Sequence, residues 1–154
     1  MTDAERPLSE RGIRAAPVVG AAMRKIGIAP ALVLCSAARR AVETWTLLAP
    51  ELPRQIPVKT MRSLYLASPS RILATIGRLP KSLDSVLVLA HNPGLHNLAL
   101  MLAGPDSKHR AMSLLREKYP TGALAEFRFH VDDWPDLRAG TGRLVRFLRP
   151  RDLA

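Results

Sequence analysis

The sequence has one cysteine in 154 residues, few aromatic side chains and no long apolar run. Cys35 lies in an apolar run and cannot form an internal disulfide, so we expect a small buried residue in a reducing cytoplasm. The polar start, Met1 to Arg6, lacks the apolar core of a secretion signal. No segment is long enough to cross a bilayer, so no membrane partner is expected. These absences favour a cytoplasmic protein.

Acidic residues are also scarce: 13 stand against 23 lysines and arginines, which gives a net charge of +10. A field of this sign attracts anions such as nucleic acid, phosphate esters or phosphoproteins. The basic residues are scattered, however, and aromatic residues make up only 5% of the chain, which is little material for stacking bases. We therefore expect a phosphate-bearing substrate and no nucleic acid. A basic nucleic-acid-binding domain is an alternative that rests on charge alone.

With 47% hydrophobic residues, the chain is predicted to form a single domain over residues 1–154. Two short apolar runs, 31–35 and 86–90, are typical of strands buried on both faces. An extended segment is expected near 56–61, and two alternating runs near the C-terminus predict a hairpin with a long connection. Apolar residues recur at helical spacing in four segments: 9–27, 38–50, 68–79 and 93–104. The order of these elements predicts an α/β fold with three α/β/α layers.

Both buried runs end in polar residues and are followed by a helix. His91 follows the second run, and Arg40 lies near the start of the helix after the first. In an open parallel sheet these strand ends meet at one edge, where ligands bind. An arginine there could grip a phosphate with two N–H groups. The competing interpretation is a structural histidine and a solvated arginine, and one of Arg39 and Arg40 must face away from any such site.

The remaining histidines and tryptophans receive structural interpretations. His96, one helical turn after His91, either lines the rim of the pocket or serves packing. His109 and His130 are expected at the surface, and Trp45 in the core. No cluster of His, Cys, Asp or Glu has the spacing of metal ligands, so neither a metal nor a cofactor is expected.

Several passages together resemble the histidine phosphatase superfamily, which has the phosphoglycerate-mutase-like fold, and most closely its small bacterial phosphohistidine phosphatases of the SixA type. The matches run in order along nearly the whole chain. Arg6 to Gly12 is similar to the family's RPLTxxG segment, and Ser36 to Thr44 to its SPxxRAxQT segment. Ser63 to Pro69 is similar to LYxASP, and Ala90 to Leu95 to GHNPGL. Segments 119–124 and 149–153 also resemble that branch.

The resemblance implies a phosphohistidine or phosphomonoester phosphatase that works through a phosphohistidine intermediate, with a phosphohistidine protein as one substrate. Arg40 would be the catalytic phosphate-binding arginine and Arg6 a second clamp. His91 would be the family's second catalytic histidine and donate a hydrogen bond to a transferring oxygen. Asn92 would contribute to substrate binding together with the backbone amides at the helix start. Small departures, such as Glu43 in place of a common glutamine, put little in doubt.

One departure is larger: the family's nucleophile is a histidine in an Arg-His-Gly or Arg-His-Ala motif on the first strand. None of the four histidines here has that context. The resemblance implies that this central strand, expected between the 31–35 and 86–90 strands, is missing from the chain. We expect it upstream of Met1, in a segment on the order of 20 residues. The alternative is a non-catalytic phosphate- or phosphoprotein-binding relative, since this chain alone is expected to be inactive. The two remaining strands would then pair with each other, or borrow a strand from a second copy in a homodimer.

Overall fold

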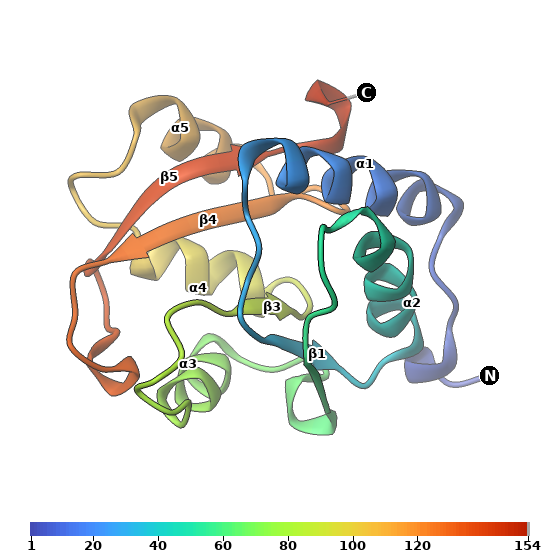
Figure 1. The fold of residues 1–154 in the computed structure, drawn as a ribbon, viewed down its shortest axis with the longest axis horizontal. Coiled ribbons are helices and arrows are strands. Elements are labelled where there is room, and N and C mark those ends of the chain that lie inside the picture. Colours follow the sequence, from blue (N-terminus) through green and yellow to red (C-terminus); the bar gives the residue numbers. More distant parts are fainter. Residues whose placement is uncertain (154) are drawn as a thin grey trace.

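A parallel sheet of three short strands lies at the centre of the computed structural model, which describes residues 1–153 (Figure 1). Its strand order is β2-β1-β3, with β1 (Val33–Ser36) in the middle. β2 (Val58–Met61) and β3 (Leu87–Leu89) pair with β1 on either side, and both run parallel to it. All four residues of β1 are buried, as expected for a strand covered on both faces.

Helices cover both faces of this sheet: α1 (Glu10–Ile26), α2 (Arg39–Leu48), α3 (Pro69–Gly77) and α4 (Gly94–Leu102). Successive residues of β1 point to opposite faces. Val33 and Cys35 pack with α1 and α2, whereas Leu34 packs with α3 and α4. The predicted three-layer α/β/α arrangement is therefore confirmed. No helix among residues 1–153 is both long and apolar enough to span a bilayer.

The C-terminal part forms the predicted hairpin, in which β4 (Leu124–Phe129) pairs antiparallel with β5 (Gly142–Leu148). Helix α5 (His109–Glu117) packs against β5 through a third apolar cluster that includes Leu115 and Leu144. Residues 1–153 also contain five short 3-10 helices: η1 (Asp3–Glu5), η2 (Ala49–Glu51), η3 (Arg62–Leu64), η4 (Trp134–Asp136) and η5 (Pro150–Asp152).

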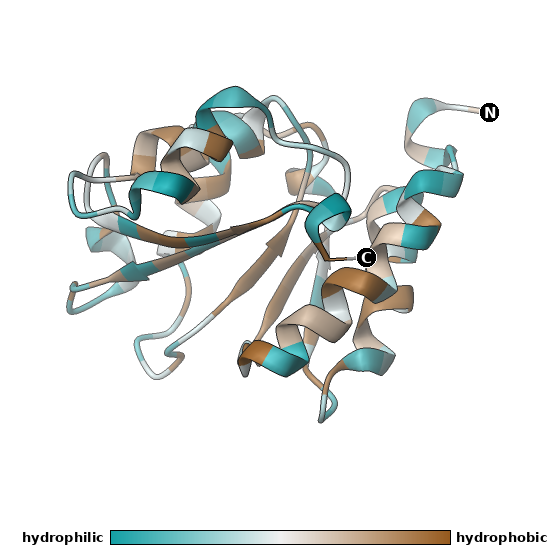
Figure 2. Ribbon diagram, turned by 90° about the horizontal axis from the view of Figure 1, so that it is seen from above, coloured by the Kyte–Doolittle hydropathy of each residue, from teal (hydrophilic) through white to brown (hydrophobic). Residues whose placement is uncertain are grey.

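The position of the open strand edges corrects one expectation. The strands predicted at 31–35 and 86–90 pair directly, with Val33 opposite Leu87, which confirms the expected pairing of these two strands. No strand lies between them, so the position expected for the missing strand is wrong. Among the described residues, β2, β3, β4 and β5 each have an unpaired edge, because each pairs with a single neighbour. The edges of β3 and β4 face each other. A cavity of about 710 Å³ lies between these two strands. Figure 2 shows the hairpin to one side of the parallel strands.

Apolar side chains line much of this cavity; among them are Val86, Val88, Leu98, Leu102, Phe127 and Phe129. These side chains come from the facing edges of the two sheets and from α4. The cavity therefore offers apolar walls together with two sets of unpaired backbone N–H and C=O groups. Such a combination accepts an extended chain segment.

The helix that follows β3 begins and ends slightly differently from the prediction. α4 begins at Gly94, with Pro93 as its N-cap. A Cβ on Gly94 would stand 1.9 Å from the backbone oxygen of Ala67, so only glycine allows this close approach. The helix ends at Leu102, and Gly104 is not its left-handed stop. Gly104 instead lies against the backbone of Gly140, where a side chain would collide.

Candidate functional site

The strand ends of the sheet bring Ser36 and His91 together. β1 ends at Ser36, and His91 follows two residues after β3. Because the two strands run parallel, with Cys35 opposite Leu89, their carboxyl ends open at the same edge. The Nε2 atom of His91 lies 2.7 Å from the Ser36 hydroxyl oxygen, and His91 is only 9% exposed. The site therefore forms at the edge that the sequence predicts.

The hydrogen bonds of Ser36 favour one tautomer of His91. Ser36 is fully buried, and its hydroxyl oxygen already accepts a bond from the backbone N–H of Ala38 at 3.2 Å. Within residues 1–153 the hydroxyl hydrogen has a single acceptor, Nε2 of His91. Donation by this hydroxyl favours the neutral tautomer with its proton on Nδ1. Nδ1 makes no bond there, and every fully buried side-chain N or O has a partner, so Nδ1 must reach solvent as a donor.

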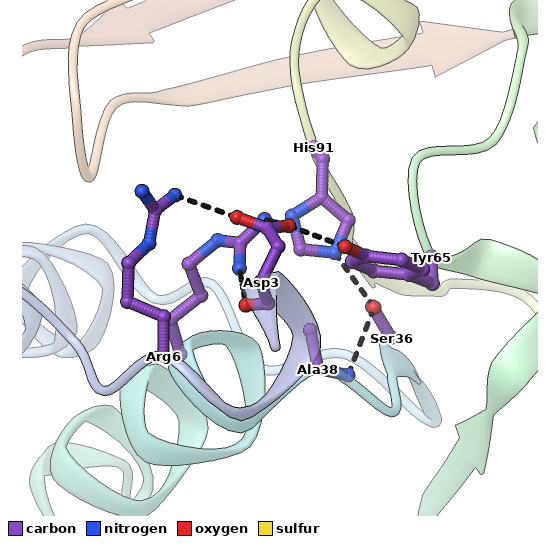
Figure 3. A network of polar contacts seen from close by, with 7 residues as sticks. Asp3, Arg6, Ser36, Ala38, Tyr65 and His91 are labelled. Atoms are coloured by element: carbon purple, nitrogen blue, oxygen red, sulfur yellow. Dashed lines mark hydrogen bonds and ion pairs between the residues drawn. The ribbon is translucent and has the colours of Figure 1, made fainter. Parts of the chain in front are cut away.

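Arg6 and Arg40 converge on a single carboxylate, that of Asp3. One oxygen of Asp3 pairs with Arg6 at 3.1 Å, and the other accepts from Arg40 at 3.2 Å. Arg40 also donates to the backbone oxygen of Asp3 at 2.9 Å. Figure 3 shows Asp3 and Arg6 beside His91 and Ser36. The two predicted clamps thus already hold an oxyanion, and it is supplied by the protein itself.

Tyr65 completes this cluster, although sequence analysis predicts no role for it beyond its place in a motif. Its hydroxyl donates to the same Asp3 oxygen that Arg40 contacts (Figure 3). Its ring meets the His91 ring edge to face, with centroids 5.6 Å apart. The Arg40 guanidinium lies 5.9 Å from the Tyr65 ring centroid, within the range of a cation–π contact. Tyr65 therefore joins the arginine side of the site to the histidine side.

The electrostatics keep His91 neutral. Burial lowers the pKa of His91 below its ordinary value of 6.5, the positive charge of Arg40 lowers it further, and Asp3 opposes both effects. For Asp3, the hydrogen bond from Tyr65 and the charges of Arg40 and Arg6 lower the pKa, against a smaller opposing effect of burial. At neutral pH the site therefore combines a neutral imidazole, two cations and one carboxylate.

Glu43 holds the Arg6 segment against α2. Its carboxylate accepts a hydrogen bond from the backbone N–H of Leu8 at 2.9 Å. The same oxygen pairs with Arg39 at 3.4 Å, and the Arg39 side chain is 54% exposed. Arg39 thus faces solvent while Arg40 faces the site, as the geometry of adjacent helical residues requires. Replacement of the family's glutamine by Glu43 keeps the acceptor that this bond needs.

The structure does not bring the Asn92 side chain into the cluster. Its amide nitrogen donates to the backbone oxygen of Tyr119 at 3.1 Å, and its oxygen accepts from the backbone N–H of His96 at 3.2 Å. The Nε2 atom of His96 lies 2.6 Å from the Leu115 oxygen, which favours the structural interpretation. The predicted role of Asn92 in substrate binding is not supported by these contacts and stays a prediction.

Four other predicted placements are confirmed. His109 and His130 are exposed, and Trp45 packs against the α1–α2 core. Cys35 is buried, and burial raises the pKa of its thiol to about 11, so it is no nucleophile at neutral pH. Among residues 1–153, no three His, Cys, Asp or Glu side chains gather as metal ligands.

In chemical terms, the fold and site define an α/β protein with two arginines and a neutral histidine donor around an oxyanion position at the carboxyl edge of its sheet. By its fold and sequence, the chain is similar to SixA-type phosphohistidine phosphatases of the histidine phosphatase superfamily. No family model matches the sequence.

The relatives and solved structures cover nearly the whole chain. The uncharacterized protein Rv1276c of Mycobacterium tuberculosis is 33% identical over 152 residues, which are 98% of this chain and 93% of that protein. The uncharacterized protein ML1117 of Mycobacterium leprae is 31% identical over 151 residues, 98% of this chain and 91% of that protein.

Among solved structures, a protein assigned as the phosphohistidine phosphatase SixA from Nakamurella multipartitia has a TM-score of 0.81 and 27% identity, over 97% of this chain and 88% of that chain. A protein histidine phosphatase SixA complexed with tungstate has a TM-score of 0.78 at 20% identity, over 99% of this chain and 90% of that chain. At this low identity, the similarity shows only that the two chains share a fold.

Proposed function

We propose that this site binds the phosphoryl group of a phosphohistidine protein or a phosphomonoester and takes part in its hydrolysis through a phosphohistidine intermediate. The observation that carries the proposal is the convergence of Arg6 and Arg40 on one carboxylate, in a cluster with His91. Two guanidinium groups suit the equatorial oxygens of a transferring phosphoryl group, on which charge is spread in the transition state. We place this activity in the cytoplasm, in keeping with the single buried cysteine.

In this mechanism each side chain has one task. Arg6 and Arg40 bind two phosphoryl oxygens and orient the phosphorus for in-line attack. The Nδ1–H of His91 donates to a phosphoryl oxygen and stabilises its charge, a task that suits a neutral imidazole whose tautomer is fixed by Ser36. A phosphohistidine substrate has a good leaving group, so the site does not require a carboxylic acid to protonate it.

The attacking group is a separate matter, because none of the four histidines is placed for it. His91 is committed to Ser36, His96 to Leu115, and the other two are exposed elsewhere on the chain. We assign the nucleophile to a histidine outside residues 1–154, on an extended segment in the cavity between β3 and β4. A strand that pairs in parallel with β3 would end beside His91, because β3 itself ends two residues before it.

The reaction then has two balanced steps. The imidazole of that added histidine attacks phosphorus, so that a P–N bond forms while the bond from phosphorus to the substrate nitrogen or oxygen breaks. Water next attacks the phosphohistidine, the P–N bond breaks, and inorganic phosphate leaves with the histidine restored. Arg6, Arg40 and His91 hold the phosphoryl oxygens in both steps.

A second function is favoured by the same lack of a placed nucleophile: a phosphate- or phosphoprotein-binding module without turnover. The two functions are distinguished by the gene and by the protein isolated from its source cell. An in-frame Arg-His pair upstream of the Met1 codon, and an intact mass above 16.9 kDa, are expected for the phosphatase. That longer protein should hydrolyse p-nitrophenyl phosphate.

The binding module predicts phosphate binding without hydrolysis by a protein of this same mass. Phosphate binding that the Arg40→Ala substitution leaves unchanged would contradict both functions.

A further inference from the structure

The oxyanion position of the site is already occupied, by the carboxylate of Asp3. Three donors from different parts of the chain meet on it: Arg6 after η1, Arg40 on α2 and Tyr65 after η3 (Figure 3). A carboxylate and a phosphoryl group offer guanidinium donors the same pair of neighbouring oxygens. The Asp3 carboxylate therefore marks where a substrate anion would bind.

Asp3 is poorly suited to act as a proton donor. The hydrogen bond from Tyr65 and the neighbouring arginine charges lower the pKa of its carboxyl, so it is ionised at neutral pH. The same bond raises the pKa of Tyr65, which therefore keeps its proton and stays a donor. Asp3 thus acts in the site as a fixed negative charge and Tyr65 as a neutral hydrogen-bond donor.

The contacts also indicate which partner leaves when an anion binds. The Asp3 side chain is 43% exposed, and it belongs to η1, a single turn without buried residues. The Arg40 side chain is only 19% exposed, is carried by α2 and lies beside the Tyr65 ring. Exposed ion pairs of this kind contribute little to stability. Displacing Asp3 is therefore easy, and the donors on α2 and after η3 remain in place.

We propose that the Asp3 carboxylate is a built-in competitor for the phosphoryl anion, and that Tyr65 is the third donor of the position it occupies. An incoming phosphoryl group displaces Asp3 and takes over the bonds from Arg6, Arg40 and Tyr65. The apparent affinity of the site is lower than its donors alone would give, because a fraction of the protein holds its own carboxylate there. The inference rests on the proposed function only for the identity of the anion.

The test compares the affinity for inorganic phosphate of the wild-type chain and its variants, by calorimetry at fixed salt. Asp3→Asn should raise the affinity about three- to ten-fold, the range of one or two exposed ion pairs. Glu5→Gln is the matched control: it makes the same change of charge in the same turn, but Glu5 contacts only the backbone of Thr2. It should change the affinity less than about two-fold.

Tyr65→Phe is measured in the Asp3→Asn background, where competition is absent. It should lower the affinity by about ten-fold, as expected for loss of one hydrogen bond to a charged acceptor. Melting curves of all variants check that they fold.

Three results would overturn the proposal. A lower affinity in Asp3→Asn would make Asp3 a residue that positions the arginines, and an effect equal to that of Glu5→Gln would reduce it to general charge. An unchanged affinity in the Tyr65→Phe double variant would remove Tyr65 from the site. Arg40→Ala separates these failures from a failure of the proposed function. If this substitution still weakens phosphate binding, the phosphate site itself is supported even when the roles of Asp3 and Tyr65 are not.

Discussion

Replacement of Arg40 by alanine tests the phosphate site through its most buried cation. The guanidinium makes two bonds at 2.9 and 3.2 Å to Asp3, and its side chain is only 19% exposed. Hydrogen bonds to charged groups contribute about 1.5–3 kcal/mol each. Loss of one such contact to phosphate corresponds to a roughly 10- to 150-fold weaker affinity. Because wild-type Arg40 must release Asp3 to bind phosphate, we expect a value near the lower end, about ten-fold.

The neighbouring residue provides the control. Arg39→Ala removes the same charge one position away, from a side chain that is 54% exposed and pairs with Glu43. Screening at physiological salt should keep its effect below about two-fold. Calorimetric titration with inorganic phosphate measures both variants, and Arg40→Lys shows how much depends on the two-pronged guanidinium. Equal weakening by Arg39→Ala and Arg40→Ala would refute the reasoning, since only long-range charge would then be at work.

Three further predictions concern the shell around the site. Gly94→Ala should lower the free energy of unfolding by about 1–3 kcal/mol or more in urea titrations, because its Cβ would meet the Ala67 oxygen at 1.9 Å. Gly77→Ala is the control: its Cβ would have its nearest contact at 3.8 Å, so this substitution should not lower the free energy of unfolding to this extent. Ser36→Ala should cost about 1–3 kcal/mol and shift His91 away from the Nδ1–H tautomer, which ¹⁵N NMR detects; an unchanged tautomer would contradict the assignment. Because the pKa of His91 is lowered below 6.5 in the folded protein, protonation of this histidine favours the unfolded chain. The stability that is present above pH 6.5 should therefore be lost as the pH falls through the lowered pKa. The His91→Gln substitution should remove this dependence of stability on pH.

The helices and the edge of the sheet that carries the site could be predicted because their signals are local. Ser9 caps α1 through the backbone N–H of Gly12, and Gly27 ends that helix with φ at 93°. The apolar runs locate the strands to within about two residues. Their pairing is harder to predict, because the sequence of a strand buried on both faces does not indicate which strand lies beside it. The direct pairing of β1 with β3 was one of two expected outcomes, whereas the cavity beside β3 appeared only in the structure.

The same distinction between local and tertiary signals applies to the site. Arg6, Arg40 and His91 were found through family motifs and strand ends, both readable along the chain. Asp3 lies in a polar segment without periodicity, and its position depends on Arg40 and on the bond between Glu43 and the backbone of the Arg6 segment. Tyr65 stood in a recognised motif, but its proximity to His91 is a tertiary contact. No signal in the sequence joins these two residues into one cluster.

A crystal structure of this chain with inorganic phosphate tests the central claim most directly. The account predicts a phosphate at the place of the Asp3 carboxylate, within hydrogen-bond distance of Arg6, Arg40 and the Nδ1 atom of His91, with Asp3 turned away. A phosphate held by other residues, or a site in which Asp3 keeps both arginines at saturating phosphate, would contradict it.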